Sequence, residues 1–423
     1  MKIREIRTEA DLIPITSKGR DRKKGGSEWK ARLIKDKNGN IRAILNNAVA
    51  VLENHPELAG VIGYDEFALR TMRMKPTPWT EDVGPWTDQD DLETTRWLQQ
   101  QGVLVRMPEA AQAVQAVAYR RRFHPVRDYL NGRKWDGIRR IDSWLIDYLG
   151  VAPSEYAAAV GARWLIAAVA RIMRPGCKVD NCLILEGSQG LFKSKVVDAL
   201  AGDWRTDGVP DLHSKDAAVQ LNGVWIVELA ELDSLTRAEA GTIKAFLSRH
   251  TDRYRPPYGR RAEDFPRQCV FVGTANLTDY LKDETGGRRF WPVACAETFE
   301  KDQKIDVEGL AAVRDQLFAE AAVRYREGVK WWLDTPELEE AAREEQADRT
   351  PEHPWKPQIE AYLLKNRNPT AEEILEDCLR LDTKDRNQAN KTTVGKVMTS
   401  LGWRARRGRK DGGGHERRYE KRK

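Results

Sequence analysis

The sequence is poor in cysteine, and its cysteines are not arranged in pairs. Only five occur among 423 residues, at positions 177, 182, 269, 295 and 378. An odd and scattered set does not form a disulfide framework and is typical of reduced thiols in a cytoplasm. Cys177 and Cys182 also lack the second pair of cysteine or histidine ligands that a structural zinc site needs. We therefore expect unremarkable, buried thiols.

A long uncharged apolar run is also missing. The first residues, Met-Lys-Ile-Arg-Glu-Ile-Arg, lack the apolar core of a signal peptide. The most apolar stretch, residues 156–173, is interrupted by Arg163 and Arg171, and arginine is costly in a membrane-spanning helix. The sequence predicts a soluble, cytoplasmic protein.

Neither positive nor negative charge dominates the chain as a whole. Its 71 basic and 65 acidic residues leave a formal net charge of +6. This charge is concentrated at the end, because residues 404–423 hold ten Lys or Arg against three Asp or Glu. The basic element of the chain is therefore its tail.

The length of the chain and its changes in composition indicate several domains, since 423 residues are too many for one ordinary core. Residues 1–40 are polar and basic, which predicts a flexible segment. Residues 41–115 carry apolar positions at helical spacing, which predicts a small accessory domain that is mostly helical. Residues 116–345 form the predicted central domain, and residues 350–423 form a last compact unit.

The hydrophobic pattern of the central segment changes about half-way along it. Helical patterns fill its first part, and the Ala-rich run at 157–173 predicts a buried helix. Short apolar runs then alternate with helical patterns, at residues 182–185, 224–227 and 269–273. Unbroken apolar runs of this length between helices predict a sheet that is covered on both faces. The predicted fold class is α/β.

The first apolar run leads into a glycine-containing loop and then a helix. The backbone N–H groups of such a loop and the N-terminus of the helix form a phosphate site. Residues 187–194, Gly-Ser-Gln-Gly-Leu-Phe-Lys-Ser, match the phosphate loop G-x-x-x-x-G-K-[ST] except at one position. We predict that Lys193 contacts the β- and γ-phosphates of ATP and that Ser194 ligates Mg²⁺. The predicted ATP-binding residues are Gly187, Ser188, Gln189, Gly190, Leu191, Phe192, Lys193 and Ser194.

The exception is Phe192, which stands where the pattern has glycine. A side chain at this position either crowds the loop or needs a backbone angle that glycine adopts more easily. Taken alone, the loop can also be a Gly/Ser turn. The nucleotide-site interpretation therefore depends on the residues that follow.

Carboxylates follow the second apolar run. Glu228 ends this run, and Glu231 lies three residues further along. We expect Glu228 to orient Mg²⁺ through water and Glu231 to polarise the attacking water near the γ-phosphate. The alternative is a strand that exits into a solvent-facing acidic loop.

The third apolar run ends in Asn276, and two arginines, Arg288 and Arg289, follow on a glycine-led loop. The amide of Asn276 is suited to hold water or the γ-phosphate at the carboxyl edge of the sheet. Arginine stabilises the charge on a transferred phosphoryl group and can act across a subunit interface. A turn asparagine and surface salt bridges are the alternatives. The predicted catalytic residues are Lys193, Glu228, Glu231, Asn276, Arg288 and Arg289.

A basic segment with interleaved aromatic residues lies between the second and third runs. Cationic side chains bind phosphates and aromatic faces stack on bases, as binding of single-stranded nucleic acid requires. The predicted DNA contacts are Arg253, Tyr254, Arg255, Tyr258, Arg260 and Arg261. A solvated basic loop is the alternative.

The last unit, residues 350–423, predicts three helices followed by a basic two-stranded turn. Its second helix starts at Thr370, where Thr-Ala-Glu-Glu is a capping box. This order is similar to a winged helix, a fold that places its third helix in a DNA groove. The predicted phosphate contacts are Lys391, Lys396, Arg404, Arg406 and Arg407. A protein-docking module is the alternative.

Six motifs between residues 122 and 293 resemble the virulence-associated E family of P-loop ATPases, which is related to superfamily 3 helicases of the AAA+ class. The motifs are residues 124–130 with 134–137, then 187–194, 225–233, 252–260, 270–276 and 287–293. The resemblance implies a P-loop, AAA+-like core with Lys193 and Ser194 as the Walker A pair. It also implies Walker B acids at 228 and 231, a sensor at 276, and an arginine finger at 288 or 289.

The resemblance also implies partners. Superfamily 3 helicases form rings, so we expect a homo-oligomer, a hexamer in the leading interpretation, that binds ATP and Mg²⁺ between subunits. Residues 253–261 fall where those helicases carry a DNA-contacting hairpin in the ring channel. Family members commonly belong to phages and other mobile elements, often beside a primase. The chain has no paired Asp-x-Asp motif on a predicted strand that would give it a primase site of its own.

The leading functional hypothesis is therefore a ring-forming replication helicase or initiator ATPase that moves on single-stranded DNA. A second hypothesis keeps a DNA-stimulated ATPase without processive unwinding, as in phage defence or loading. A third is a DNA-binding regulator whose nucleotide site is degenerate. The third depends on Phe192, the residue that departs from the phosphate-loop pattern.

Overall fold

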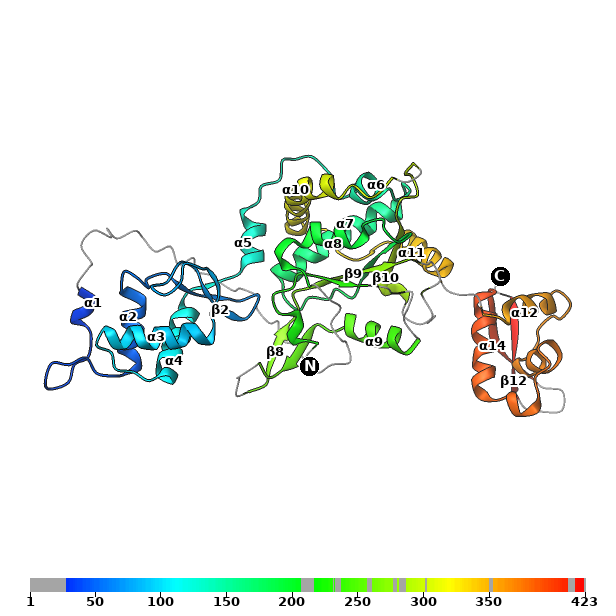
Figure 1. The fold of residues 1–423 in the computed structure, drawn as a ribbon. Coiled ribbons are helices and arrows are strands. Elements are labelled where there is room, and N and C mark those ends of the chain that lie inside the picture. Colours follow the sequence, from blue (N-terminus) through cyan, green and yellow to red (C-terminus); the bar gives the residue numbers. More distant parts are fainter. Residues whose placement is uncertain are drawn as a thin grey trace, which may run out of the picture.

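The computed structural model describes residues 28–206, 217–230, 232, 237–256, 261–276, 280, 287–300, 303–349, 353–409 and 415–421. Figure 1 shows three bodies in chain order. An N-terminal unit is drawn in blue and cyan, a central unit in green and yellow, and a C-terminal unit in orange and red. The central unit holds the segments that we expect to carry chemistry.

The N-terminal unit packs helices against a small sheet. Its helices are α1 Glu28–Ala31, α2 Leu45–Asn54, α3 Asp88–Gln100 and α4 Met107–Arg120. Its strands are β1 Ile62–Asp65, β2 Arg70–Arg73, β3 Gly84–Pro85 and β4 Arg122–Phe123, in the order β3-β2-β1-β4. Leu52, Leu58, Ile62 and Leu98 are buried together in its core. Helices are present as predicted, and the sheet is an addition whose strands are too short to stand out in the sequence.

Residues 28–40 correct the prediction of a flexible segment over residues 1–40. They form α1 and a turn, and Trp29 and Leu33 pack in the core of the N-terminal unit. The backbone N–H of Ile34 donates to Asn47 Oδ1 at 2.9 Å. Apolar anchors therefore hold this stretch in place despite its charges. Residues 1–27 lie outside the described residues.

A four-stranded parallel sheet forms the centre of the molecule. Its strands are β5 Cys182–Glu186, β6 Ile226–Leu229, β9 Val270–Ala275 and β10 Phe290–Ala294, in the order β10-β5-β9-β6. Each pair of neighbours in this sheet is parallel. The predicted α/β class is confirmed.

Helices cover both faces of this sheet, as its apolar strands predict. The helices of the central unit are α5 Pro125–Gly132, α6 Trp144–Leu149, α7 Glu155–Met173, α8 Lys193–Ala201, α9 Arg237–Leu247, α10 Val307–Arg326 and α11 Pro336–Asp348, with short 3-10 turns at η1 Gly202–Trp204, η2 Val219–Leu221 and η4 Gly287–Arg289. On one face, Leu183, Ile226 and Val272 pack with α7, α8 and α10. On the other face, Ile184 and Phe271 pack with α9. Alternate strand residues thus enter two separate cores.

Helix α7 lies in the core of the central unit. Among the described residues it is the helix whose length and composition match a membrane span, yet 78% of its most apolar window is buried inside the protein. The indole of Trp164 donates to Phe271 O at 2.8 Å, and the guanidinium of Arg171 donates to Val179 O at 2.6 Å. Trp164 thus bonds to the sheet and Arg171 to the segment before β5, as in a core helix. Tyr156 Oη, Arg163 Nε and Arg171 Nε are buried without a hydrogen-bond partner among the described residues.

Strands β7 Thr251–Tyr254 and β8 Glu263–Pro266 form an antiparallel hairpin. A buried ion pair holds its base, with Arg267 Nη2 2.9 Å from Asp252 Oδ1 and the same guanidinium 4.1 Å from the centre of the Phe246 ring. The hairpin leads directly into β9, so its base lies at the amino edge of the parallel sheet. Residues 257–260, between the two strands, lie outside the described residues.

The C-terminal unit contains the elements expected for it, in the expected order. They are α12 Lys356–Leu363, α13 Ala371–Glu373 with the turns η5 Ile374–Cys378 and η6 Thr383–Asp385, α14 Gln388–Ser400, and the paired strands β11 Trp403–Arg409 and β12 His415–Lys421. The predicted capping box is confirmed, because Thr370 Oγ1 accepts from Glu373 N while Glu373 Oε2 accepts from Thr370 N. Ile359, Ile374 and Met398 lie in its small core.

Candidate active site

The carboxyl edge of the parallel sheet gathers the predicted catalytic side chains. Strand β5 ends at the glycine-containing loop, and β9 ends just before Asn276. Strand β9 lies between β5 and β6, and Glu228 is in register with Val272. Because parallel strands end at one edge, the loop, Asn276 and Glu228 belong to one region.

The loop at residues 187–192 is shaped by three left-handed backbone positions. Gly187 has φ 141°, Gly190 has φ 86° and Phe192 has φ 69°. The φ of Gly187 favours glycine, because an L side chain rarely adopts it, and a Cβ atom there would also lie 2.6 Å from Leu191 Cδ1. Phe192 adopts the angle that the phosphate-loop pattern assigns to glycine, which confirms the second of the two consequences expected for it. Its ring points outward, is 46% exposed and lies 4.7 Å from Lys304 Nζ.

Helix α8 begins immediately after this turn. Its N-cap residue is Phe192, which offers no side-chain cap to the first N–H groups of the helix. Uncapped N–H groups at a helix start favour an anion. The loop therefore presents its amide donors where a phosphate group would need them.

Lys193 lies across the loop. Its side chain is buried, and Nζ donates to Gly187 O at 2.6 Å, Ser188 O at 2.9 Å and Asn276 Oδ1 at 3.2 Å. The structure thus brings together two predicted residues, Lys193 at the start of α8 and Asn276 just after β9.

Ser194 and Glu228 form the second contact between predicted residues. Ser194 Oγ donates to Glu228 Oε1 at 2.7 Å, and Thr274 Oγ1 donates to the same oxygen at 3.1 Å. Three oxygen-bearing side chains therefore meet beside the start of α8. Oxygen ligands are those that Mg²⁺ prefers.

Thr274 is a site residue that the prediction missed. Val270 and Val272 of β9 lie in the core on the α8 face of the sheet, so Thr274 and Asn276 continue that face at period two. Ile226 on β6 places Glu228 on the same face. The alternation of side chains along β9 could therefore have predicted from the sequence that Thr274 faces the site. Glu231, the other predicted acid, lies outside the described residues.

A buried ion-pair network stands directly behind the loop. Glu186 is 1% exposed, accepts from Tyr280 Oη at 2.8 Å, and lies 2.9 Å from Arg349 Nη2. Burial alone would lower the pKa of Arg349, but its hydrogen bonds to Glu186 and the carboxylate charge raise it. Burial and Glu186 also raise the pKa of Tyr280. This network was not foreseen, because its members are far apart in the sequence.

The two predicted arginines lie at the opposite edge of the sheet. Phe290 is in register with Cys182 and Ala294 with Glu186, so Arg288 and Arg289 precede the start of β10. A strand of this length spans about 15 Å. Arg289 Nε donates to Ser248 Oγ at 2.8 Å. Within one chain these arginines are not brought to the 187–192 loop.

The predicted DNA contacts on the hairpin differ in how far their side chains are exposed to solvent. Arg253, Arg255 and Arg261 are exposed, and Arg253 lies 3.8 Å from Asp264. The Tyr254 ring, by contrast, stacks on Phe265 at 4.3 Å and its hydroxyl donates to Asn222 at 2.8 Å. Burial raises the pKa of the Tyr254 phenol. Tyr254 therefore supports the hairpin, and Tyr258 and Arg260 lie outside the described residues.

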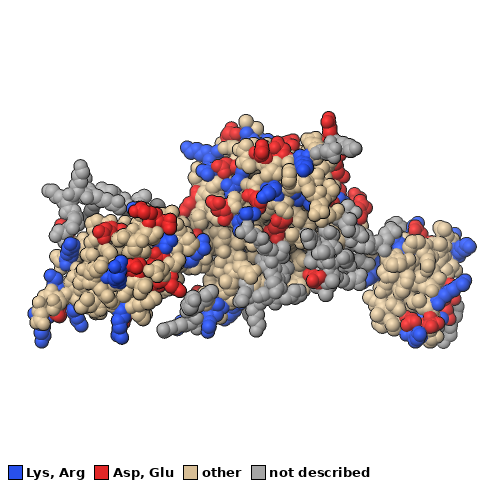
Figure 2. Space-filling view, viewed as in Figure 1, with Lys and Arg blue, Asp and Glu red and all other residues tan. Residues whose placement is uncertain are grey.

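The predicted contacts of the C-terminal unit are partly engaged in ion pairs. Lys391 Nζ lies 2.5 Å from Glu372, and Arg404 and Arg406 lie 2.8 and 3.3 Å from Glu420. Lys396 on α14 is exposed, and Arg407 lies in β11. Figure 2 shows Lys and Arg side chains along the outer edge of this unit.

Within the described part of the chain, no group of three or more His, Cys, Asp or Glu side chains is positioned to hold a metal ion. The five cysteines are free thiols, and burial raises the pKa of Cys295, which lies beside the loop, to about 12.

Comparison with known families identifies the central part of this fold. Residues 130–351, more than half of the chain, match the virulence-associated protein E-like domain. The chain belongs to this family. The virulence-associated protein E-like domain thus spans the sheet, the 187–192 loop and Arg288 and Arg289, and it ends shortly after Arg349. No curated protein matches the chain.

Solved structures give more distant matches. The apo structure of the NrS-1 C-terminal region is 12% identical, covers 84% of this chain and 95% of that one, and has a TM-score of 0.46. An A-form apo structure of the same region is 11% identical, with 85% and 95% coverage and a TM-score of 0.44.

Phe192→Gly and Phe192→Ala together measure the strain in the loop. Both remove the ring, but only glycine removes the Cβ atom that makes the left-handed conformation costly. We expect the central unit of the glycine variant to have a free energy of unfolding about 1 kcal/mol higher than that of the alanine variant. Urea unfolding of both proteins checks this. Equal stability would contradict a strained residue at position 192.

Proposed function

We propose that this virulence-associated protein E-like chain is a DNA-dependent ATPase that binds ATP and Mg²⁺ at the carboxyl edge of its sheet. One observation carries the proposal. The first two residues of α8 each contact the end of a different strand, since Lys193 reaches Asn276 and Ser194 reaches Glu228. A turn without ligand function has no need of these two polar links.

The residues present fit a magnesium nucleotide. The amides of the loop and of the start of α8 would hold the phosphates, and Lys193 would donate to the β- and γ-phosphates. Ser194 would ligate Mg²⁺, with Glu228 and Thr274 holding its water ligands. When bound, the metal ion would neutralise charge on the phosphate oxygens.

The remaining roles follow from position. Asn276 lies between the loop and Glu228, where its amide would orient the attacking water or the γ-phosphate. Glu231 follows Glu228 closely in the sequence, and we assign it the role of polarising that water. Glu186 and Arg349 position the loop from behind without contacting the nucleotide.

The placement of Arg288 and Arg289 supports a site completed between subunits. Both lie at the amino edge of the sheet, so neither reaches the nucleotide of its own chain. A head-to-tail ring would set this edge against the carboxyl edge of a neighbour, where an arginine would stabilise the transferred phosphoryl group. We therefore propose a homo-oligomeric ring, with six subunits as the leading assignment.

DNA is the proposed partner of the hairpin and of the C-terminal unit. Arg253, Arg255 and Arg261 project from the hairpin as phosphate contacts for a single strand. The C-terminal unit, with its α14 helix and basic strand pair, would bind duplex DNA as a winged helix does. The role that unites these parts is a replication helicase or initiator of a phage or other mobile element, acting beside a primase.

Lys193→Ala tests the ATPase assignment. Removing this donor is expected to lower kcat by about a hundredfold to a thousandfold, because the phosphates lose a charge-assisted hydrogen bond. Lys195→Ala is the matched control, since Lys195 is exposed and pairs with Asp198 on the next turn of α8. Phosphate release is measured with and without single-stranded DNA. Absence of turnover in the unmodified protein would contradict both enzymatic hypotheses and leave the DNA-binding regulator.

A mixing experiment tests the ring. One protein carries Arg288→Ala and Arg289→Ala, and the other carries Lys193→Ala, so each alone lacks one half of the composite site. Mixed subunits are expected to regain part of the wild-type activity, because some interfaces then hold an intact loop and intact arginines. Activity no higher than the sum of the two separate proteins would contradict a role for the arginines across the interface.

A further inference from the structure

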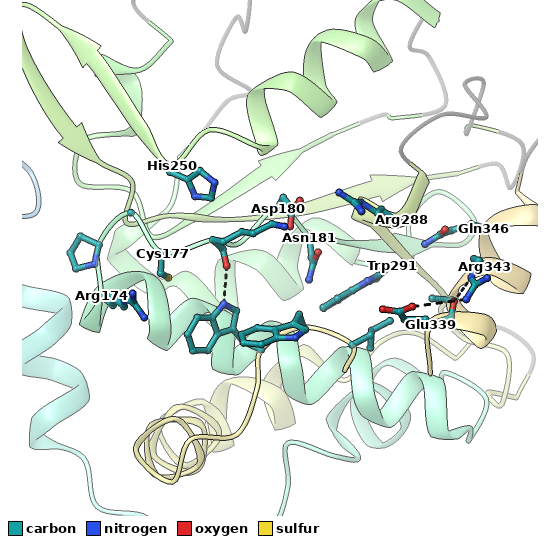
Figure 3. A pocket seen from close by; sticks show the side chains of 17 residues that line it. Arg174, Cys177, Asp180, Asn181, His250, Arg288, Trp291, Glu339, Arg343 and Gln346 are labelled. Atoms are coloured by element: carbon teal, nitrogen blue, oxygen red, sulfur yellow. Dashed lines mark hydrogen bonds and ion pairs between the residues drawn. The ribbon is translucent and has the colours of Figure 1, made fainter. Parts of the chain in front are cut away.

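A hollow with a volume of about 1120 Å³ opens at the amino edge of the central sheet. It is lined by the segment between α7 and β5, by His250 before the hairpin, by η4 and by residues around the start of α11 (Figure 3). We call it the tryptophan pocket, after Trp291, Trp331 and Trp332 in its wall. Asn181 lines it and Gly187 does not, and the strand between them spans about 15 Å. The pocket is therefore separate from the candidate active site.

Two neighbouring indoles give the pocket aromatic surface. The Trp331 ring is fixed, since Nε1 donates to Lys178 O at 2.8 Å and the ring packs on Tyr325. The Trp332 ring meets it edge-on at 5.2 Å, is 43% exposed, and has Lys330 Nζ 5.3 Å from its centre. An exposed indole on a rigid base is a low-entropy platform for a flat ligand.

The charge of the pocket is positive. Arg174, Lys178, Arg288 and Arg343 line it, against the carboxylates of Asp180 and Glu339. Arg343 is engaged with Glu339 and Glu340. The side chains of Arg174, Lys178 and Arg288 make no hydrogen bond or ion pair to any residue that the structure describes. Arg288 is already assigned to the subunit interface, so Arg174 and Lys178 remain as the cations that have no partner among the described residues. Two such cations beside an exposed indole favour an anionic aromatic ligand.

The pocket is continuous with the base of the hairpin. Gly176 N donates to Arg267 O at 2.9 Å, and Arg267 N donates to His250 O at 2.9 Å. Figure 3 shows His250 beside the strands at the upper left of the view, with Arg174 below it on the same side of the pocket. A strand that follows the exposed arginines of the hairpin toward its base would therefore reach the pocket next.

We propose that the tryptophan pocket binds a nucleotide unit of single-stranded DNA, with the base stacked on Trp332 and the phosphate held by Arg174 and Lys178. The inference rests on the proposed function for its ligand, because it assumes that the hairpin binds a single strand. The inference does not depend on ATP turnover. A DNA-binding experiment can therefore contradict it while the ATPase assay still supports the proposed function, and the reverse is also true. Stacking and phosphate contact together require no particular base.

The first test is binding of a labelled single-stranded oligothymidine of about 16 residues to the full chain without nucleotide. Trp332→Ala is expected to weaken binding by about fivefold to a hundredfold, and Trp332→Phe to retain most of the affinity because a ring remains. Arg174→Ala is expected to reduce the salt slope of the affinity by about 0.7, the value for one phosphate of a single strand. Arg139→Ala, an exposed arginine outside the pocket, is the matched control and should leave the slope unchanged.

The second test identifies the residues that contact the DNA. An oligonucleotide carrying 5-iodouracil is crosslinked by light, and the modified peptide is identified by mass spectrometry. Crosslinks to Trp331 or Trp332 support the proposal. Crosslinks confined to the hairpin or the C-terminal unit, together with wild-type binding by the Trp332 and Arg174 variants, would overturn it. Equal competition by thymidine monophosphate would overturn it in favour of a free mononucleotide site.

Discussion

The parallel register of β5, β9 and β6 is the constraint on which the candidate site depends. With β9 between the other two strands, one sheet edge receives the loop, Asn276 and Glu228 together. Helix α8 then closes the site, because its first residue bonds to one strand end and its second to another. A shift of one residue in any of these strands would turn the polar side chains to the opposite face, into the apolar core beneath α9.

The residues proposed to bind ATP and those proposed to bind DNA lie at opposite edges of the sheet. The carboxyl edge holds the groups suited to ATP, whereas the amino edge holds the hairpin, the arginine pair and the tryptophan pocket. Strands β5 and β10 run from one of these edges to the other, so they connect the two groups of residues directly. The buried bond between Glu186 and Arg349 adds a link from the loop to the end of α11, beyond which the chain continues to the C-terminal unit.

Local patterns in the sequence predicted the parts of this account that depend on nearby residues. The glycine-like angle at Phe192 and the capping box at Thr370 each follow from a few adjacent positions, and the α/β class follows from short apolar runs that alternate with helical patterns. Partners far apart could not be predicted in this way, as with Glu186 and Arg349, which are separated by 163 positions. Tyr254 shows the same limit, because its ring belongs to an aromatic pair that only the hairpin register creates. The roles assigned to the site residues remain predictions.

Binding of a non-hydrolysable ATP analogue tests the central claim most directly, since it needs neither DNA nor a ring. Calorimetric titration is made with and without Mg²⁺, on the unmodified protein and on Ser194→Ala. The account predicts that Mg²⁺ tightens binding to the unmodified protein by about tenfold or more, a difference of about 1.4 kcal/mol, and that Ser194→Ala loses this gain. Failure of the unmodified protein to bind the analogue, or an affinity indifferent to both Mg²⁺ and Ser194, would contradict it.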